Sequence, residues 1–178
     1  NYIILKKLSL NLKIQWNTLI YSNIIKTILL WQNKFMAVNV YTDGACSGNP
    51  GIGGWGVVIL IDDCEPIHLN GGSFNTTNNK MELTAAIEAL KYFKKNSTIN
   101  LFTDSKYVKD GIESWIINWK KNGWKTASKK SVKNKMLWVE LDTQLARHSI
   151  NWQWIKGHLG HIHNEQADYL ARRFIEEN

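Results

Sequence analysis

The sequence predicts an α/β protein with a mixed β-sheet and helices packed on that sheet. Three β-branched, apolar runs come first along the chain, and further strand-like runs then alternate with helical periods. A meander of strands followed by strands that alternate with helices is typical of a mixed sheet. A chain of 178 residues with 44% hydrophobic and 21% charged residues is sufficient for one soluble domain with a buried core.

Five apolar or alternating runs predict the strands of this sheet. They lie at Ala37–Asp43, Trp55–Ile61, Ile67–Gly71, Ile99–Asp104 and Ile150–Lys156. A glycine-rich loop joins the first two, and its segment GIGGWG matches the pattern G-x-G-x-x-G. That pattern binds dinucleotides only where it opens a helix, whereas here it opens the β-branched run WGVVILI. We therefore expect a hairpin turn at the glycine loop rather than a dinucleotide site.

Helical periods predict four helices, and two of them flank a lysine-rich segment. The helices lie at Asn78–Phe93, Ser105–Lys121, Lys133–His148 and Asn164–Glu176. The lysine-rich segment runs from 114 to 139 and holds seven lysines and no acidic residue. A basic segment within a domain that is otherwise close to neutral predicts a local contact with a polyanion.

Residues 1–35 differ in composition from the rest of the chain. They hold five lysines and no acid, glycine or proline, and they carry +5 of the net charge of +7, which leaves +2 for residues 36–178. Lysine and asparagine interrupt the apolar runs too often for a membrane span of about 20 residues, and no signal-peptide pattern is present. We expect one domain over residues 36–178, beginning at Met36. Residues 1–35 are expected to lie outside the fold, as an upstream read-through or a misassigned start. A basic targeting extension is the alternative, although transit peptides are usually arginine-rich and this segment has no arginine.

The two cysteines, Cys46 and Cys64, form no disulfide framework. A reducing compartment is therefore expected, and we predict a cytoplasmic protein that has no membrane contact.

Four acidic residues stand where a solvated side chain is not expected. Asp43 and Asp104 each end a strand, Glu82 shares a helical stripe with apolar residues, and Asp168 borders another apolar stripe. Each of them alone is compatible with a turn, a cap or a solvated acid. Together they need a common partner, and a hard divalent cation such as Mg²⁺ or Mn²⁺ is the natural one. Two such ions can activate a water and stabilise a leaving oxygen in phosphodiester hydrolysis.

A zinc site at the closely spaced histidines 158, 161 and 163 is disfavoured, because the cysteines lie too far away in the sequence to complete it.

Five segments resemble those of bacterial type 1 ribonucleases H, in the same order and with the same spacing. They are YTDGACSGNPGIGGWG, TTNNKMELTAAIEAL, TDSKYVKDGI, WKKNGWKTASKKSVKN and WIKGHLGHIHNEQADYLA. The resemblance spans Met36 to Asn178 and implies the ribonuclease H-like fold, a five-stranded mixed sheet flanked by helices on both faces. It also implies endonucleolytic hydrolysis of RNA paired with DNA, which leaves 5′-phosphate and 3′-hydroxyl ends.

The resemblance further implies a set of site residues. Asp43, Glu82, Asp104 and Asp168 would bind Mg²⁺, with Mn²⁺ as a substitute. His158, the first histidine of KGHLGH, corresponds to the family's mobile catalytic histidine, and a surface histidine is the alternative. The RNA–DNA hybrid would be contacted around the metal site by Gly44, Cys46, Asn49, Thr77, Asn78, Asn79 and Lys106. Thr77 with Asn49 resembles a pocket for a phosphate of the DNA strand.

The lysine-rich segment resembles the basic protrusion of many bacterial members. Its implied contacts with nucleic acid are Trp115, Trp119, Lys120, Lys121, Trp124, Lys125, Lys129 and Lys130. The alternative is a solvated amphipathic helix whose tryptophans pack against one another.

Three departures from the family pattern stand out. Asn75 replaces a frequent arginine, Lys106 a frequent glutamine, and Ile162-His163 a proline-acid pair. None of them removes a predicted catalytic group. We therefore expect a Mg²⁺-dependent endoribonuclease that acts as a monomer. The rival hypotheses are a non-catalytic hybrid-binding module and a transposase or integrase domain on the same fold.

Overall fold

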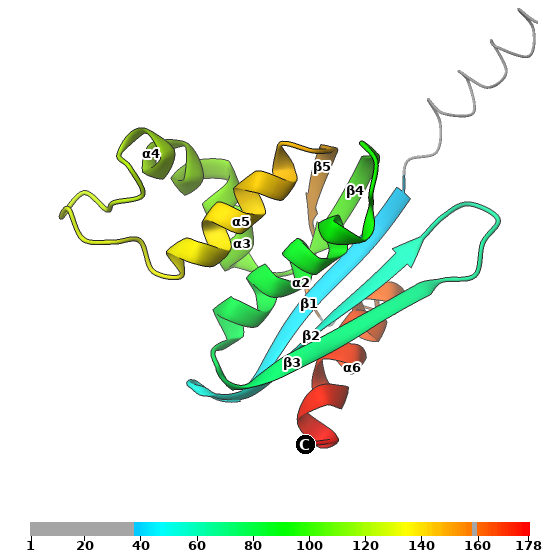
Figure 1. Cartoon of the computed structure of the whole chain (residues 1–178). Coiled ribbons are helices and arrows are strands. Elements are labelled where there is room, and N and C mark those ends of the chain that lie inside the picture. The colour runs from blue at the N-terminus through cyan, green and yellow to red at the C-terminus, as the bar shows by residue number, and fades with distance from the viewer. Residues whose placement is uncertain (1–37, 158–159) are drawn as a thin grey trace, which may run out of the picture. The chain divides into compact units, whose positions relative to one another are not determined.

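The computed structural model describes residues 38–157 and 160–178, which contain one five-stranded sheet (Figure 1). Its strands are β1 (Val38–Gly48), β2 (Gly51–Leu60), β3 (Ile67–Thr76), β4 (Thr98–Thr103) and β5 (Ser149–Trp154). They are arranged in the order β3-β2-β1-β4-β5, so β1 is the central strand. The β1–β2 and β2–β3 pairs are antiparallel, while the β1–β4 and β4–β5 pairs are parallel. The predicted mixed sheet is confirmed.

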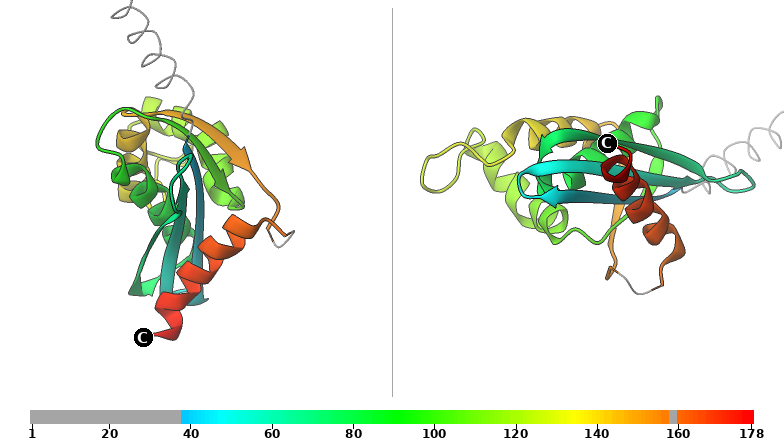
Figure 2. Two further views of the ribbon diagram at one scale, coloured as in Figure 1. Left: turned by 90° about the vertical axis from the view of Figure 1, so that its right-hand side faces the viewer. Right: turned by 90° about the horizontal axis from the view of Figure 1, so that it is seen from below.

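Helices cover both faces of the sheet. On one face α2 (Asn78–Tyr92) packs across β1 and β2, and α5 (Lys135–Leu145) packs against α2. On the other face α6 (Ile162–Glu176) crosses β1, β2 and β3, as the two views of Figure 2 show. Within the described residues, no helix has the length and apolar character that a membrane crossing requires.

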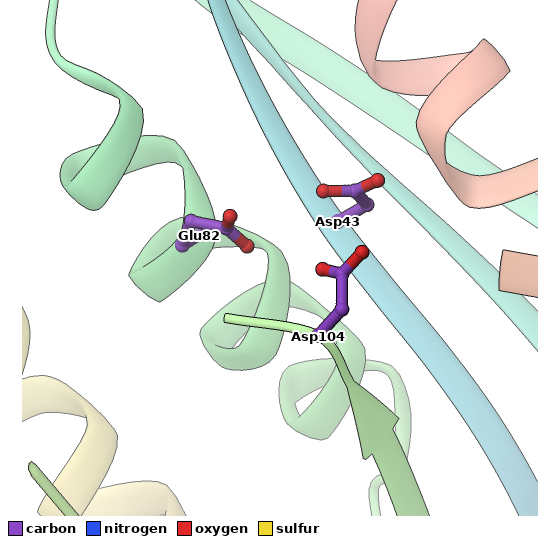
Figure 3. Close-up of side chains that lie close together, drawn as sticks. All are labelled: Asp43, Glu82 and Asp104. Carbon is purple, nitrogen blue, oxygen red and sulfur yellow. The ribbon is translucent and has the colours of Figure 1, made fainter. Parts of the chain in front are cut away.

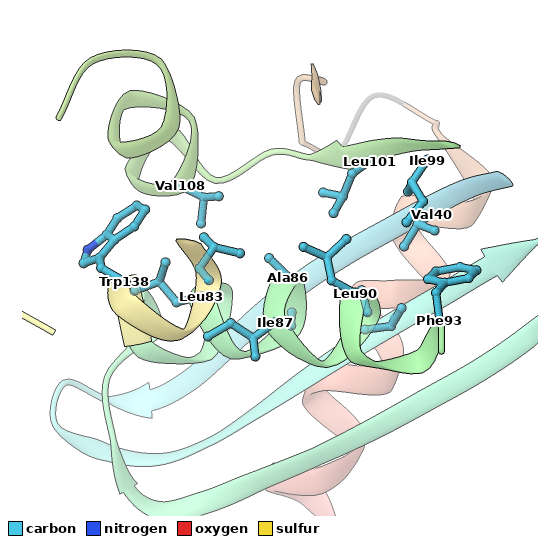
Figure 4. Close-up of a cluster of buried hydrophobic side chains, with 14 of the residues drawn as sticks. Val40, Leu83, Ala86, Ile87, Leu90, Phe93, Ile99, Leu101, Val108 and Trp138 are labelled. Atoms are coloured by element: carbon cyan, nitrogen blue, oxygen red, sulfur yellow. The ribbon is translucent and has the colours of Figure 1, made fainter. Parts of the chain in front are cut away.

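The hydrophobic core divides into two layers because the side chains of a strand alternate between its faces. On β2, Val57 and Ile59 are fully buried beneath α2, whereas Val58 is buried against Ala167 and Leu170 of α6. The larger layer lies between the sheet, α2 and α5, and Figure 4 shows its members. Both faces of the central strands are therefore apolar, as expected for strands covered on both sides.

The predicted length of the glycine loop between the first two strands is wrong, because the loop is much shorter than expected. Both strands continue through it, with Gly44 paired to Trp55 and Gly48 to Gly51, so the turn itself is only Asn49 and Pro50. The glycines serve close packing of helices on the strands. A Cβ at position 44 would overlap the α2 backbone, and a Cβ at position 56 would overlap the Ala167 carbonyl oxygen of α6.

The predicted helix 105–121 is interrupted by a short π-helical turn. The segment consists of α3 (Lys106–Asp110), the π-helical turn η1 (Gly111–Trp115) and α4 (Ile116–Lys121). Gly111 lies directly against the indole of Trp138, where a Cβ would overlap the ring. The other predicted elements are present, with ends shifted by a few residues. The predicted boundary after residue 35 stays a prediction, because residues 1–37 lie outside the described residues.

Truncating the core of α5 should destabilise the fold far more than truncating its surface. Leu141 and Met136 are both long apolar residues of this helix, but Leu141 is fully buried and Met136 is 80% exposed. We expect Leu141→Ala to lower the free energy of unfolding by about 2–5 kcal/mol. Met136→Ala is the matched control and should change it by less than about 0.5 kcal/mol. Urea unfolding measures both values, and equal losses would contradict the assigned core.

Candidate metal centre and nucleic-acid interface

Three carboxylates converge just beyond the point where the parallel pairing of β1 with β4 ends (Figure 3). Asp43 lies on β1, Glu82 on α2, and Asp104 directly follows β4. One oxygen atom from each side chain lies within 4.8 Å of the others. Asp43 and Asp104 are brought together by the parallel pairing of β1 with β4, and Glu82 by the close approach of α2 at Gly44.

Each of the three carboxylates accepts one hydrogen bond that fixes its orientation. The Gly44 amide donates to Asp43 Oδ1 at 2.7 Å, and Asn78 Nδ2 donates to Glu82 Oε1 at 3.3 Å. Asn164 Nδ2 of α6 donates to Asp104 Oδ2 at 3.2 Å. The sequence interpretation missed Asn164. Its signal was a polar residue three positions before the apolar Ala167 on the buried stripe of α6.

Two of the clustered carboxylates, Asp43 and Glu82, hold protons more strongly than free carboxylates do. The pKa of Asp43 is raised from 3.8 to about 8, first by burial and then by the negative charges of Asp104 and Asp168. Burial, followed by the charges of Asp43 and Asp104, raises the pKa of Glu82 well above its ordinary value. These raised pKa values indicate that the nearby positive charge of Arg172 does not offset burial and the mutual repulsion of the acids.

The cluster suits a hard divalent cation. Glu82 Oε2 is buried and has no hydrogen-bond partner among the described residues. Such a buried acceptor requires a partner that the protein itself does not supply. Carboxylate oxygens are the ligands that Mg²⁺ and Mn²⁺ prefer. The three acids line an open cleft of about 620 Å³, which gives a cation access to them.

Asp168, the fourth predicted acid, lines the same cleft but is bound to an arginine. Arg172 Nε, one turn further along α6, donates to Asp168 Oδ1 at 2.8 Å. The Asp168 carboxylate does not belong to the converging group of three. The sequence interpretation missed Arg172, although its spacing of four residues from Asp168 on a helix was a sufficient signal.

His158 lies outside the described residues, so its predicted catalytic role stays a prediction. Of the two other histidines in this region, His163 Nδ1 lies 3.1 Å from Gln166 Oε1, and its ring centroid is 5.3 Å from that of Tyr41. Within residues 38–157 and 160–178, no group of three metal-ligating side chains converges except Asp43, Glu82 and Asp104.

The predicted contact residues near the acids occupy several different environments. Gly44, Cys46 and Asn78 line the cleft. The hydroxyl of Thr77, the residue that precedes α2, is buried, caps no amide and has no partner among the described residues. Three further predicted residues do not line the cleft but are at least partly accessible to solvent, namely Asn49, Asn79 and Lys106.

The segment that resembles the basic protrusion, residues 115–135, combines packed tryptophans with exposed lysines. Trp115 and Trp119 have ring centroids 5.5 Å apart, and Trp119 contacts Trp138 of α5 at 5.4 Å. Trp124 also packs on the core. The predicted mutual packing of the tryptophans therefore occurs. Lysines on the outer surface are exposed, namely Lys120, Lys121, Lys125, Lys129, Lys130 and Lys133. Among them, Lys120 forms an ion pair with Asp142 at 2.8 Å.

Comparisons with known proteins agree on one family. The RNase H family model matches residues 36–176. A ribonuclease H of Rhodopseudomonas palustris (strain TIE-1) is 58% identical over 141 residues, which are 79% of this chain and 90% of that protein. The crystal structure of LC9-RNase H1, a type 1 RNase H with the type 2 active-site motif, matches with a TM-score of 0.70 and 32% identity. It covers 78% of this chain and 71% of that chain. LC11-RNase H1 in complex with RNA/DNA hybrid has a TM-score of 0.60, 21% identity, and coverage of 79% and 97%. At that identity, the second match supports the fold alone.

The metal-free protein should lose stability as the pH rises from about 4 to about 8. The pKa values of Asp43 and Glu82 are raised on folding, so the folded state binds more protons than the unfolded state across this window. The free energy of unfolding therefore falls with rising pH. Asp43→Asn removes one of these charges and should stabilise the chelator-treated protein by about 1–3 kcal/mol at pH 8.5, and by less at pH 5. The exposed Asp62→Asn serves as the control in urea unfolding. A gain for Asp43→Asn that does not depend on pH would contradict this account.

Proposed function

We propose that this chain, which belongs to the ribonuclease H family, hydrolyses the RNA strand of RNA–DNA hybrids with divalent cations as cofactor. The observation that carries the proposal is the group of three converging carboxylates, two of them buried, that line an open cleft. The exposed lysines of the basic protrusion supply a second, polyanion-binding surface. The relative LC11-RNase H1, solved with an RNA/DNA hybrid, shares the fold.

In this proposal, Asp43, Glu82, Asp104 and Asp168 hold two Mg²⁺ ions, with Mn²⁺ as a substitute. Bound in this cleft, the ions would lower the pKa of an attacking water and neutralise charge on the phosphate and the leaving oxygen. The protein contributes rigidity, because two of the acids lie on or next to paired central strands and the third lies on a buried helix. Asn78, Asn164 and the Gly44 amide keep three carboxylates in their orientations.

The proposed reaction transfers the phosphorus from one oxygen to another. Water attacks phosphorus, the bond to the 3′ oxygen breaks, and that oxygen takes up a proton. The products are a 5′-phosphate, which contains the water oxygen, and a 3′-hydroxyl. We assign His158 to proton transfer around this phosphate, because an imidazole with a pKa near 6.5 titrates in the physiological range.

The substrate is distinguished by its backbone rather than by its base sequence. RNA differs from DNA by the 2′-hydroxyl, which is accessible across a shallow minor groove. Short polar groups near the acids, from Cys46, Asn49, Asn78 and Asn79, suit that contact. The unpartnered Thr77 hydroxyl suits a phosphate of the DNA strand. The lysines of the protrusion would meet further phosphates as point charges. We propose that the protein acts in this way as a cytoplasmic monomer.

Replacing a metal ligand should abolish cleavage but leave hybrid binding. Asp104→Asn keeps the side-chain size and removes the ligand charge. Partners in the outer shell of a metal affect activity by about 10–100-fold, so loss of a direct ligand should lower kcat at least about 100-fold. The dissociation constant for the hybrid, measured by fluorescence anisotropy in chelator, should change by less than about threefold.

The control for this measurement is the exposed Asp110→Asn on α3, which should keep full activity. The wild type is tested on labelled RNA–DNA hybrid, double-stranded RNA and double-stranded DNA, each with Mg²⁺ and with chelator. Equal cutting of double-stranded DNA would favour the transposase or integrase reading. Absence of metal-dependent hybrid cutting would favour a binding module.

Neutralising the protrusion should weaken substrate binding in a salt-dependent manner. We expect Lys129→Ala/Lys130→Ala to raise KM more than it lowers kcat. The slope of log affinity against log salt should become shallower by about one to two. Lys94→Ala/Lys95→Ala removes the same charge from two exposed lysines after α2 and is the matched control. Identical slopes for the two double variants would show that the protrusion does not contact nucleic acid.

A further inference from the structure

We propose that Arg172 is a positioning residue that holds Asp168 away from the metal centre. A divalent cation that recruits Asp168 must first displace Arg172 from it. The inference deepens the proposed function and rests on it, because it concerns the fourth acid of the same cleft. It assigns to Arg172 a role in setting the affinity of the cleft for the metal.

The geometry of α6 places Arg172 where it competes with a cation in the cleft for the Asp168 carboxylate. Arg172 follows Asp168 by one turn, and its Nε donates to Asp168 Oδ1 at 2.8 Å. Both side chains line the cleft that contains the three converging acids. Among the described residues that line this cleft, Arg172 is the one cationic side chain. It is therefore the internal counterion of an acidic site.

The ion pair opposes metal binding because it occupies the ligand. A carboxylate oxygen that accepts a hydrogen bond from a guanidinium has a lone pair and part of its charge already engaged. Consistent with this, Asp43, Glu82 and Asp104 have oxygen atoms within 4.8 Å of one another, while Asp168 stands outside the group. Any cation that recruits Asp168 must first break the pair. The measured metal affinity is then reduced by the free energy of that step.

The pair is weak enough to be broken. The side chain of Arg172 is 56% exposed and that of Asp168 is 25% exposed, so solvent screens their attraction. Glu176, one further turn along α6, also lines the cleft, and its negative charge acts on Arg172. When Asp168 turns to the metal, the guanidinium can move to Glu176 and keep an acidic partner.

The neighbouring arginine supplies a matched control on the same helix. Arg173 Nε pairs with Glu177 Oε1 at the same spacing of four residues, and its side chain is 50% exposed. Arg173 does not line the cleft. Arg173→Ala therefore removes the same charge and the same kind of ion pair as Arg172→Ala, but away from the metal centre.

The test is isothermal titration of Mg²⁺ alone into the full chain, without nucleic acid. We expect Arg172→Ala to tighten Mg²⁺ binding roughly two- to fivefold, the change that corresponds to one partly exposed ion pair. Arg173→Ala should leave the dissociation constant unchanged. Arg172→Lys keeps the charge but loses the Nε donor, so its value should lie between those of the wild type and Arg172→Ala.

A double-mutant cycle separates positioning of Asp168 from a general effect of positive charge. In the background of Asp168→Asn, Arg172→Ala should tighten Mg²⁺ binding much less, because the restrained group is gone and only the direct effect of the Arg172 charge on Asp43 remains. The rise in thermal midpoint on adding Mg²⁺ gives a second readout. Equal affinities for the wild type and Arg172→Ala, or an effect of undiminished size in Asp168→Asn, would overturn the proposal.

The outcome also separates this proposal from the proposed function. If the wild type binds Mg²⁺ and cleaves hybrid while Arg172→Ala binds Mg²⁺ no more tightly, only the role of Arg172 is refuted. If the wild type neither binds Mg²⁺ nor cleaves hybrid, both are refuted.

Discussion

The close contact of α2 with β1 is the constraint on which the metal centre depends. At Gly44, a side chain of any size would overlap the α2 backbone at Met81 and Glu82. The missing side chain lets the helix pack directly on the strand, so Glu82 reaches the part of β1 that carries Asp43. Burial of Ala85, Ala86 and other small residues of α2 stabilises the same contact. The same contact between α2 and β1 therefore forms part of the core and brings the metal-binding acids together.

This arrangement places function and stability in opposition. Three acids brought together in a partly buried cluster repel one another, and burial, followed by the charges of Asp43 and Asp104, raises the pKa of Glu82. Core packing of the sheet against α2 and α5 must offset that repulsion in the metal-free protein. A bound cation would relieve the repulsion directly, so the ligand that enables the chemistry would also stabilise the fold. The unfavourable clustering of acids at the metal centre is thus compensated by favourable packing elsewhere in the protein.

The sequence was sufficient for the sheet and for the position of most helices, because periodicity is a local signal. Three of the four predicted acids converge, but Asp43, which was expected to end its strand, lies five residues before the end of β1. Glu82 was assigned to a buried stripe, and it is 7% exposed. The extent of β1 and β2 was not predictable from the glycines alone. These glycines allow close packing of helices that lie far away in the sequence. The same limit hid the π-helical turn at Gly111, which lies against Trp138, and the Asn164–Asp104 hydrogen bond, which joins residues 60 positions apart. The pairing of Asp168 with Arg172 was missed although its spacing is local.

The two sides of the site are expected to differ in the timescale of their motions, because Asp43 lies on the central strand whereas Asp168 and Arg172 lie on α6. Asp43 lies on the central strand and is paired with Gly56 of β2, so we expect its backbone amide to exchange slowly, through large openings of the sheet. Asp168 and Arg172 lie on α6 at the side of the cleft, and the exposed side chain of Arg172 is expected to change rotamer on the nanosecond timescale. Hydrogen exchange would thus report global opening at Asp43, while side-chain relaxation at Arg172 would report rapid local motion. Asp43, on the sheet, would define where a cation binds. Asp168 and Arg172, on α6, would determine how quickly the last ligand reaches that cation.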